Sequence, residues 1–414
     1  MTLESNVKQS WWQMTSIQIG GVICLPILMA GQELARTYGF AKAALLIIIG
    51  NSLLFLLGLV KIRMAYKNKK TTIQNAKDYF DKKGTKLFAS TIIVSLVGWF
   101  AIQLNLISLS VEKGLGAILG YNPINPLILN IIIGAIITLA ALKGIRALNK
   151  LSDISMPVLA IAMGYTLYKA FVYGGVSSAP VIAGSYKGIS LVLASSLLAI
   201  IDFPTYYRFA KSLKDGVISI LATVILATSA IELIGTYVAI KLPGATILET
   251  LTAYSGTYYQ VFILLFLVLA GWTTNNANLY SSSVTLENIY PKLSQTKSTL
   301  LVGFIGTFIS CFNVIAKFEA TLALMGILIS SMGAVIAVRY IAKCFFKYLP
   351  KISGYNLIAW GFGVVQGFFV FFNIFSISGI EIIDAFVISF VASVLVTILQ
   401  ILLLSCKNSK VRMF

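Results

Sequence analysis

Residues 261–280 read Val-Phe-Ile-Leu-Leu-Phe-Leu-Val-Leu-Ala-Gly-Trp-Thr-Thr-Asn-Asn-Ala-Asn-Leu-Tyr. Ten apolar residues lead, without a charge or a turn signal, into a decapeptide that contains two threonines and three asparagines. At bilayer depth each of these polar side chains costs several kcal/mol if it lacks a partner. A membrane helix keeps such groups where they face a polar cavity. This stretch therefore predicts a spanning helix that lines a ligand or ion site on a transport pathway.

The composition extends this prediction to the whole chain. Of the 414 residues, 58% are hydrophobic and 11% are charged, and the mean hydropathy is +0.90. A soluble protein carries about 25% charged residues, so these values indicate a polytopic membrane protein. A span needs about 20 mostly apolar residues. We predict twelve spans, at residues 16–33, 38–60, 88–110, 126–143, 154–173, 188–207, 216–240, 259–283, 299–314, 318–338, 355–376 and 385–405.

The distribution of basic residues gives the predicted orientation. The net charge is +18, and with both chain ends on one side, 25 of the 32 Lys and Arg residues fall in one set of loops and tails. Nine of them lie between Lys61 and Lys86, and Arg339 to Lys351 form another basic connector. This asymmetry places both termini in the cytoplasm and the protein in the cell (plasma or inner) membrane. The expected partner of the basic face is anionic lipid headgroups rather than nucleic acid, and we infer no obligate protein partner.

The first ten spans divide into two sets of five that cross the membrane in opposite senses. This is the inverted repeat of LeuT-like secondary transporters, whose sites lie between discontinuous helices near the membrane midplane. Gly20-Gly21 and Pro26 interrupt the first span, and Ser195-Ser196 with Asp202-Phe203-Pro204 occupy the corresponding span of the second set. We predict an all-α fold with a cytoplasmic tail (1–15), a ten-helix core (16–338), a connector with two further helices (339–405) and a second cytoplasmic tail (406–414).

Trp99 and Gln103 in the third span are four residues apart and therefore lie on one helix face. An indole beside a carboxamide suits a flat heterocycle, because the ring can stack on the indole while the amide reads donors and acceptors along the ring edge. Trp in a span also packs or anchors at the interface, and Gln also bonds neighbouring helices. The pair alone is a weak indication.

Thr273 and Thr274 present two adjacent hydroxyl oxygens one turn after Ala270. With the Ala270 carbonyl and carbonyls of the broken first span near Gly20 and Ile23, they would make a five-oxygen shell for Na⁺. The alternative is that each threonine bonds back to a carbonyl of its own helix. The same helix carries three carboxamides whose donors it cannot satisfy alone: Asn275, Asn276 and Asn278.

Acidic residues within spans are further candidates, because an intramembrane acid is a functional hypothesis by default. Glu232 lies deep in the seventh span, as a candidate for proton coupling or as a protonated packing residue. Asp202 and Asp384 lie near span ends, where we expect them to be solvated.

Three segments resemble the nucleobase–cation symporter family. They are Trp99-Phe-Ala-Ile-Gln103, Tyr207-Arg-Phe-Ala-Lys-Ser212 and Trp272-Thr-Thr-Asn-Asn-Ala-Asn-Leu-Tyr280. The nearest branches are the cytosine permeases and the hydantoin transporters. The resemblance covers the ten core spans, and it implies twelve helices in a five-plus-five inverted repeat with two more at the end.

The resemblance also implies roles for individual residues. Trp99 would stack on the substrate and Gln103 would bind its edge, with Asn275 or Asn278 as a further contact. The sodium site would consist of Thr273, Thr274 and the carbonyls of Ala270, Gly20 and Ile23.

Two positions depart from the family pattern. Ser196 stands where a second stacking aromatic is found, so the ring would be held on one face only, or with the help of Phe203. We therefore expect a substrate larger than a single pyrimidine or a less selective site. Leu96 stands where the cytosine branch carries Gln.

The function class follows from these residues together. The absence of histidine excludes Ser–His and HExxH chemistry, and neither a nucleotide-binding loop nor a repeated channel filter occurs. We predict a non-enzymatic symporter, without a cofactor, that takes up a small planar nucleobase-like heterocycle (cytosine, a purine, a hydantoin or allantoin) with Na⁺ or H⁺. The alternatives are another small substrate of the wider amino-acid/cation symporter superfamily and, far behind it, an intramembrane enzyme.

Overall fold

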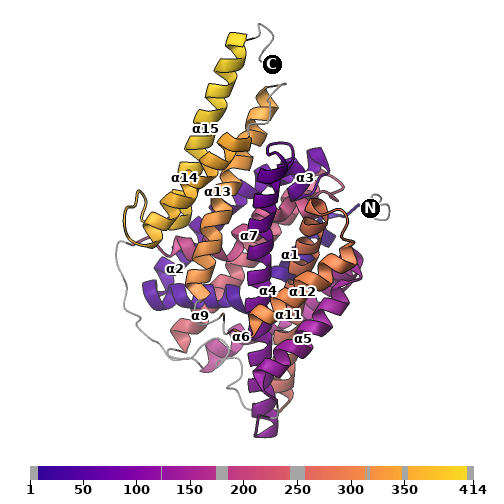
Figure 1. Ribbon diagram of the computed structural model, residues 1–414. Coiled ribbons are helices and arrows are strands. Elements are labelled where there is room, and N and C mark those ends of the chain that lie inside the picture. Colours follow the sequence, from indigo (N-terminus) through magenta and orange to yellow (C-terminus); the bar gives the residue numbers. More distant parts are fainter. Residues whose placement is uncertain are drawn as a thin grey trace.

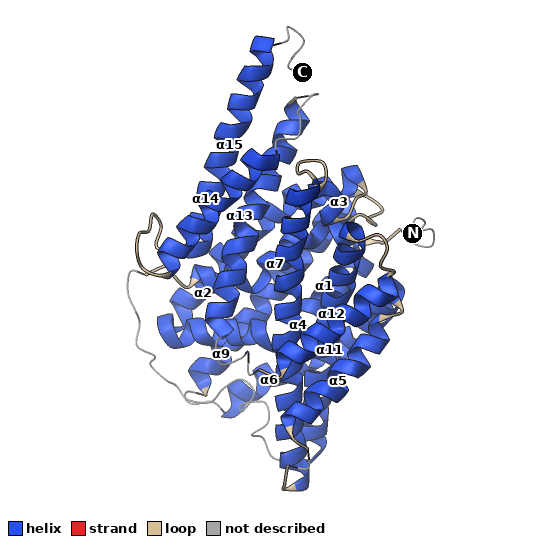
Figure 2. Ribbon diagram, in the orientation of Figure 1, coloured by secondary structure: helices blue, strands red, loops and turns tan. Residues whose placement is uncertain are grey.

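The computed structural model describes residues 8–122, 124–173, 185–242, 257–312, 314, 318–346 and 353–407, and most of them are helical (Figure 2). The helices lie side by side in a bundle, beyond which α15 projects toward the C-terminus (Figure 1). They are α1 (Trp11–Val22), α2 (Leu25–Asn68), α3 (Thr72–Ala76), α4 (Lys82–Leu119), α5 (Pro126–Ala141), α6 (Gly144–Tyr173), α7 (Ile189–Tyr207), α8 (Leu213–Ile220), the π-helix η1 (Leu221–Thr228), α9 (Ser229–Lys241), α11 (Thr257–Ile289), α12 (Gln295–Ser310), α13 (Phe318–Phe345), α14 (Ser353–Phe371) and α15 (Glu381–Lys407).

These helices accommodate the twelve predicted spans. In the described residues, nine helical stretches are long and apolar enough to cross a membrane, and α8, η1 and α9 together form one of them. α5 and α12, with 16 residues each, are shorter than the typical span. α2 serves two spans, which meet at Gly39, where φ is 71° and only a residue without Cβ is unstrained.

The first span is broken between α1 and α2, as its glycines and proline predict. Pro26 has no N–H, so it cannot donate to the carbonyl of Val22, and the Cys24 N–H bonds that carbonyl instead (2.8 Å). Ile23 and Cys24 adopt non-helical conformations, with ψ of 82° and 160°. The break leaves main-chain carbonyls available in the middle of the molecule.

The corresponding span of the second set is not broken, and that part of our expectation was wrong. α7 runs through Ser195-Ser196, and Ser195 Oγ donates to the carbonyl of Val192 (2.7 Å). Serines can bond back to their own helix without interrupting it. Pro204 lies inside the last turn of α7, close to where the helix ends anyway.

The seventh span contains a π-helical segment, η1, that we did not predict from the sequence. In η1, Thr228 Oγ1 donates to the carbonyl of Thr223 (3.0 Å) and Ser229 Oγ to that of Val224 (3.4 Å), both five residues earlier. Such wide turns are rare and occur often at functional sites.

Two glycines allow α2 and α9 to cross in backbone contact. A Cβ at Gly31 would lie 1.9 Å from the Glu232 carbonyl oxygen, and a Cβ at Gly235 would lie 2.1 Å from that of Leu28. Thr236 Oγ1 donates to the carbonyl of Gly31 (3.0 Å) across the same contact. Small residues at helix crossings are typical of membrane bundles.

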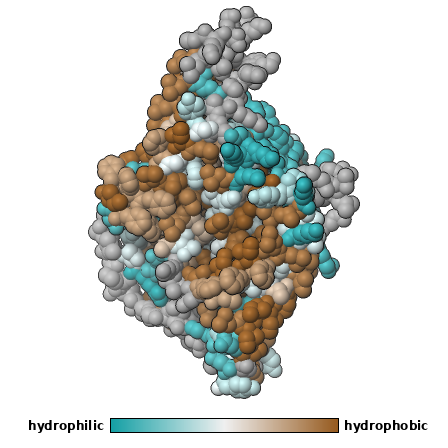
Figure 3. All heavy atoms as spheres, in the orientation of Figure 1, coloured by the Kyte–Doolittle hydropathy of each residue, from teal (hydrophilic) through white to brown (hydrophobic). Residues whose placement is uncertain are grey.

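The outer surface is apolar over a broad region, and hydrophilic residues gather at the end that carries α3 (Figure 3). Phe304 on α12, for example, is 71% exposed, as expected of a lipid-facing side chain. Two basic residues that we assigned to cytoplasmic segments lie instead inside helices. Lys61 is buried in α2 with Nζ 3.4 Å from the Gly333 carbonyl, and Arg339 is buried in α13 and donates to Gln400 Oε1 (2.7 Å).

Candidate functional site

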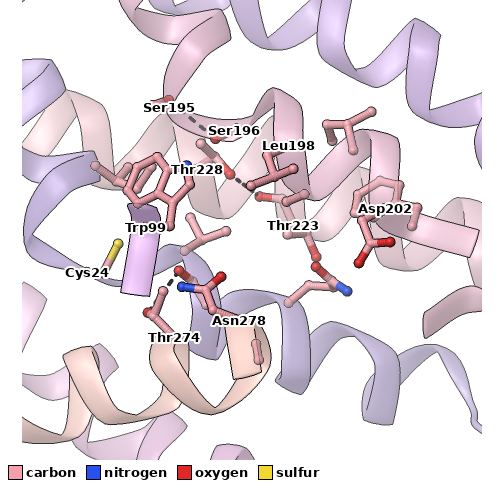
Figure 4. A pocket seen from close by; sticks show the side chains of 18 of the residues that line it. Cys24, Trp99, Ser195, Ser196, Leu198, Asp202, Thr223, Thr228, Thr274 and Asn278 are labelled. Carbon is pink, nitrogen blue, oxygen red and sulfur yellow. Dashed lines mark hydrogen bonds between the residues drawn. The ribbon is translucent and has the colours of Figure 1, made fainter. Parts of the chain in front are cut away.

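A cavity of about 100 Å³ lies between α1, α2, α4, α7, η1 and α11 (Figure 4). Trp99 and Cys24 lie at one end of it in Figure 4, and Asp202 lies at the other. Ser195 and Ser196 line it from α7, and Thr274 and Asn278 from α11. The cavity therefore lies between the first and third spans of both sets of five. In the first set these are α1–α2 and α4, and in the second set they are α7 and α11.

Trp99 lines this cavity, but Gln103 does not. Gln103 is buried one turn further along α4, and its Nε2 has no hydrogen-bond partner among the described residues. The Cys24 thiol at the helix break lies near the Gln103 and Thr274 side chains. Gln103 thus lies behind the cavity wall that Trp99 and Cys24 form.

Ser196 and Ser195 both reach the cavity from α7, and their hydroxyl oxygens lie 3.4 Å apart. Phe203, our candidate for a second aromatic wall, also lines the cavity, together with Tyr206. Phe203 packs against Tyr207 in a tilted arrangement, with the ring centroids 4.8 Å apart and an interplanar angle of 57°. Ser196 thus lines the cavity at the position where the family pattern has an aromatic residue.

The three asparagines of α11 are placed differently. Asn278 lines the cavity, and its Nδ2 has no hydrogen-bond partner among the described residues. Asn275 is fully buried, and its Nδ2 donates to the Phe100 carbonyl on α4 (3.3 Å). Asn276 is buried with an unpartnered Oδ1. Asn278 alone among them is free to bind a molecule in the cavity.

The two threonines gather carbonyls of the broken helix. Thr273 Oγ1 lies 2.6 Å from the Gly20 carbonyl oxygen and 3.0 Å from that of Ala270. Thr274 Oγ1 lies 2.9 Å from the Ala270 oxygen and 3.1 Å from that of Gly21. Each hydroxyl therefore bonds back to its own helix, as the alternative expected, and also reaches across to α1.

We call these five oxygens, from Gly20, Gly21, Ala270, Thr273 and Thr274, the oxygen cluster. Ile23 was predicted as a ligand in place of Gly21. It lies at the break, and among the described residues no main-chain N–H donates to its carbonyl. The cluster is neutral and made of hard oxygen donors, which fits a monovalent cation such as Na⁺.

Glu232 lies outside the cavity but close to it. Its carboxyl is fully buried in α9, where Asn51 Nδ2 donates to Oε2 (2.6 Å) and Ser195 Oγ to Oε1 (3.4 Å). No charged side chain in the described part of the chain forms an ion pair with it. Ser195 connects the carboxyl to the cavity that it lines.

Asp202 and Asp384 are buried, and the expectation that they are solvated was wrong. Asp202 lines the cavity with 2% exposure, and it accepts hydrogen bonds from Thr205 Oγ1 (2.7 Å) and from Ser281. Asp384 accepts from the main-chain N–H groups of Ile377 (2.7 Å) and Ser378 (2.9 Å). Neighbouring segments shield both acids from solvent. The position of a residue near the end of a predicted span does not show whether such segments fold over it.

Three side-chain contacts join α7 to α11 at the Asp202 end of the cavity. Besides Asp202 with Ser281, Tyr206 Oη donates to the Ala277 carbonyl (2.8 Å), and Arg208 Nη2 donates to Tyr280 Oη (3.3 Å). We call these contacts the α7–α11 latch. Ala210, which forms a parallel bridge with Gln9, follows Arg208 by two residues.

Several cavity residues were missed by reading the sequence: Gln18, Thr223, Thr228 and Tyr206. Gln18 is a carboxamide two residues before Gly20 in an apolar span, and this was a usable signal. Thr223 and Thr228 reach the cavity from η1, and no sequence signal marks that segment as π-helical.

Comparisons with known proteins agree with this arrangement. The family described as "Permease for cytosine/purines, uracil, thiamine, allantoin" matches residues 3–345. The cytosine permease of Escherichia coli K12 is 26% identical over 337 residues, which cover 79% of this chain and 77% of that protein. The cytosine permease of Escherichia coli O157:H7 matches with the same identity and the same coverage.

Solved structures show the fold. Mhp1, a nucleobase-cation-symport-1 family transporter in a closed conformation with bromovinylhydantoin bound, has a TM-score of 0.80 at 15% identity, covering 98% of this chain and 96% of that one. Inward-facing Mhp1 has a TM-score of 0.77 at 15% identity, with coverage of 98% and 95%. A Na⁺-coupled sialic acid symporter has a TM-score of 0.69 at 13% identity, with coverage of 94% and 90%. These likenesses confirm the predicted LeuT-like fold class.

Proposed function

Because the chain belongs to the family of permeases for cytosine and purines, uracil, thiamine and allantoin, we propose that it is a secondary transporter that takes up a small planar nucleobase-like heterocycle by alternating access. Its relatives are permeases rather than enzymes. The observation that carries the proposal is the cavity in which Trp99 faces polar groups of α7 and α11. The multi-pass fold places the protein in a membrane; the cell membrane, with both termini cytoplasmic, is the location that the basic loops support.

Substrate recognition is assigned to the two kinds of surface that line the cavity. The Trp99 indole would stack on the π-face of the ring. The unpartnered Asn278 amide, with the hydroxyls of Ser195 and Ser196, would bind the polar edge. Gln103 and Asn275 do not line the cavity. They would support its wall indirectly, Gln103 by orienting Cys24 and Asn275 by holding α4.

The cavity volume bears on the size of the substrate. A cavity of about 150 Å³ accommodates benzene, whereas this one measures about 100 Å³. A bound ring must therefore displace side chains or widen the cavity. We propose a single heterocyclic ring, such as a pyrimidine or a hydantoin, over a fused bicycle, although Ser196 alone suggested more room.

Sodium is the proposed coupling ion, held by the oxygen cluster. Thr274 belongs to that cluster and also lines the substrate cavity. An ion bound there would fix the carbonyls of the broken α1 against α11, and so fix one wall of the cavity. Ion and substrate would each favour the arrangement that the other needs, which is the requirement for coupling.

A proton is the alternative coupling ion, and the buried Glu232 carboxyl supports it. An unpaired carboxylate in the membrane interior is costly, so a neutral acid is favoured there. The Asn51 Oδ1 has no partner among the described residues, and a flip of the Asn51 amide would turn that acceptor toward a protonated Glu232. The Asn51–Glu232 pair could then satisfy both protonation states.

Counterflow in proteoliposomes tests the proposal. Radiolabelled cytosine, uracil, adenine, hypoxanthine, allantoin, a hydantoin and hydroxymethylpyrimidine would each be offered with and without Na⁺, and with and without a pH gradient. We expect counterflow for at least one single-ring compound, with an apparent affinity that depends on Na⁺. Exchange of an amino acid or a sialic acid, with none of these heterocycles accepted, would support another substrate of the wider symporter superfamily. Dependence on the pH gradient alone would transfer coupling to Glu232.

A further inference from the structure

A basic hollow of about 610 Å³ lies where the turn between α3 and α4 meets the turn between α11 and α12. Its lining includes four lysines, Lys77, Lys82, Lys86 and Lys292, against a single acid, Asp81. It is remote from the substrate cavity and shares no lining residue with it. The hollow lies in the region where hydrophilic residues gather near α3 (Figure 3).

The lysines of this hollow are arranged to leave positive charge for a ligand. Lys77 Nζ donates to the Asn288 carbonyl (2.8 Å), which ties the two turns together. Lys86 Nζ lies 4.8 Å from the centre of the Tyr290 ring. Lys82 and Lys292 have no ion-pair partner among the residues that the structure describes.

The single acid can offset only one of the four lysine charges. Asp81 is the N-cap residue of α4, and its Oδ1 accepts the Gly84 N–H (2.7 Å). Its carboxylate is thus engaged with the first turn of the helix. Two of the four lysine ammonium groups have no acidic partner, and other contacts hold the remaining two in place. This arrangement favours the binding of an anion.

The surface next to the hollow is suited to an acyl chain. On α4, about one and three turns after Lys82, Leu87 is 41% exposed and Val94 is 64% exposed. These two residues are seven apart and therefore lie on one helix face. Phe304, on the neighbouring α12, is also exposed. Charge at the start of the helix followed by exposed apolar residues matches a lipid with its headgroup at the membrane interface.

We propose that the basic hollow binds the phosphate of an anionic phospholipid from the cytoplasmic leaflet. The lysines would hold the phosphate, and the acyl chains would lie along the exposed flank of α4. A bound phosphate would bridge the start of α4 to the end of α11, the helices that carry Trp99 and Thr274. The lipid would thereby stabilise one side of the transport machinery without touching the substrate.

The test uses the full-length protein, delipidated in detergent, with phosphatidylglycerol, phosphatidylcholine and inorganic phosphate as probes. Binding would be followed by native mass spectrometry and by the thermal-unfolding midpoint. The variant is Lys82→Gln/Lys86→Gln/Lys292→Gln. The control, Lys67→Gln/Lys211→Gln/Lys214→Gln, removes equal charge from exposed positions outside the hollow.

We expect phosphatidylglycerol to remain bound and to raise the unfolding midpoint of the wild type and of the control. The hollow variant should lose roughly tenfold or more in phosphatidylglycerol affinity, because each lysine near a membrane surface contributes to anionic lipid binding. Equal losses in both triple variants would reduce the effect to overall charge and overturn the proposal. Stabilisation by phosphate alone, equal to that by the lipid, would identify a free-phosphate site and overturn the lipid assignment. If the hollow variant fails to fold, the proposal is tested by the wild-type protein alone. Stabilisation by phosphatidylglycerol that exceeds stabilisation by phosphatidylcholine and by phosphate would support it, and equal effects of the three probes would overturn it.

Discussion

At the level of single residues, the cavity places the Trp99 indole among polar groups of α7 and α11, and one of these groups, Asn278 Nδ2, lacks a partner among the described residues. Trp99 faces Ser195 and Ser196 of α7, and Asn278 has an amide with nothing to bind in the described structure. Buried polar groups without partners are uncommon unless a ligand or water completes them. This contrast between a stacking surface and open hydrogen-bonding positions is what the substrate of a nucleobase permease requires.

The stacking role of Trp99 is tested by Trp99→Ala. We expect a loss of about 1–3 kcal/mol of substrate affinity, or roughly 5- to 150-fold in Kd, because base–aromatic stacking contributes about this much. Isothermal titration of the purified protein measures it, with Na⁺ binding and the unfolding midpoint as controls for folding. Unchanged substrate affinity in a folded Trp99→Ala protein would remove Trp99 from the site.

The ion site is tested by Thr274→Val, which keeps the side-chain shape and removes one oxygen of the cluster. We expect the Na⁺-dependent part of substrate binding to be lost and the Na⁺-independent part to remain, because coupling is reciprocal. The matched control is Thr285→Val, since Thr285 is buried in the same helix, away from the cavity, with an unpartnered hydroxyl. If Thr274→Val binds substrate with the Na⁺ dependence of the wild type, the oxygen cluster is not the coupling site.

Single residues also mark the limit of prediction from sequence. Residue type and helix spacing singled out Trp99, Thr273, Thr274 and a group of three asparagines, and the structure places Trp99, Thr274 and Asn278 at the cavity. They could not show that Asp202 is covered by Ser281, because the two residues lie 79 positions apart and meet only in the folded chain. For the same reason they could not show that Gln103 lies behind the cavity wall rather than in it.

At the level of helices, the chemistry of proline explains why the break in the first span could be predicted from the sequence. Pro26 removes a main-chain donor, and the first span breaks there. α7 carries Pro204 only in its last turn, so little helix remains to be interrupted, and the serines bond back within it. The π-helical η1 depends on packing between helices rather than on a local residue type, so composition could not predict it.

The crossing of α2 and α9 is tested by Gly31→Ala. The added Cβ would lie 1.9 Å from the Glu232 carbonyl oxygen, and main chain cannot yield as a side chain can. We expect destabilisation of at least about 1–3 kcal/mol, the usual range for overpacking, measured as a lower thermal-unfolding midpoint. Gly164→Ala is the control, because a Cβ at Gly164 has nothing within 4 Å. Equal midpoints for the two variants would show that the crossing adapts.

At the level of the whole molecule, transport requires the cavity to open to one side at a time. In this structure the α7–α11 latch lies at the Asp202 end of the cavity. Beyond the latch, the segment before α1 is bound to the turn after α7. The Gln9 N–H donates to the Phe209 carbonyl (2.8 Å), and the Lys211 N–H donates to the Gln9 carbonyl (3.0 Å). Gln9 Nε2 also donates to Asn149 Oδ1 on α6 (3.2 Å).

We expect this bridge to hold the latched end closed, and Gln9→Pro tests it. Proline removes the N–H that bonds Phe209, together with the side chain that bonds Asn149, whereas the control Gln9→Ala removes the side-chain bond alone. One hydrogen bond contributes about 0.5–1.5 kcal/mol, so the population open at this end should rise about 2- to 10-fold. The reporter is Cys24, which is buried and lines the cavity, after the other three cysteines are replaced by serine. A maleimide that does not cross membranes is added to inside-out vesicles. It should label Cys24 faster in Gln9→Pro than in Gln9→Ala. Saturating Na⁺ should slow both labelling reactions if the ion favours the closed arrangement. Equal labelling rates in the two variants would mean that the main-chain bridge does not control access to the cavity.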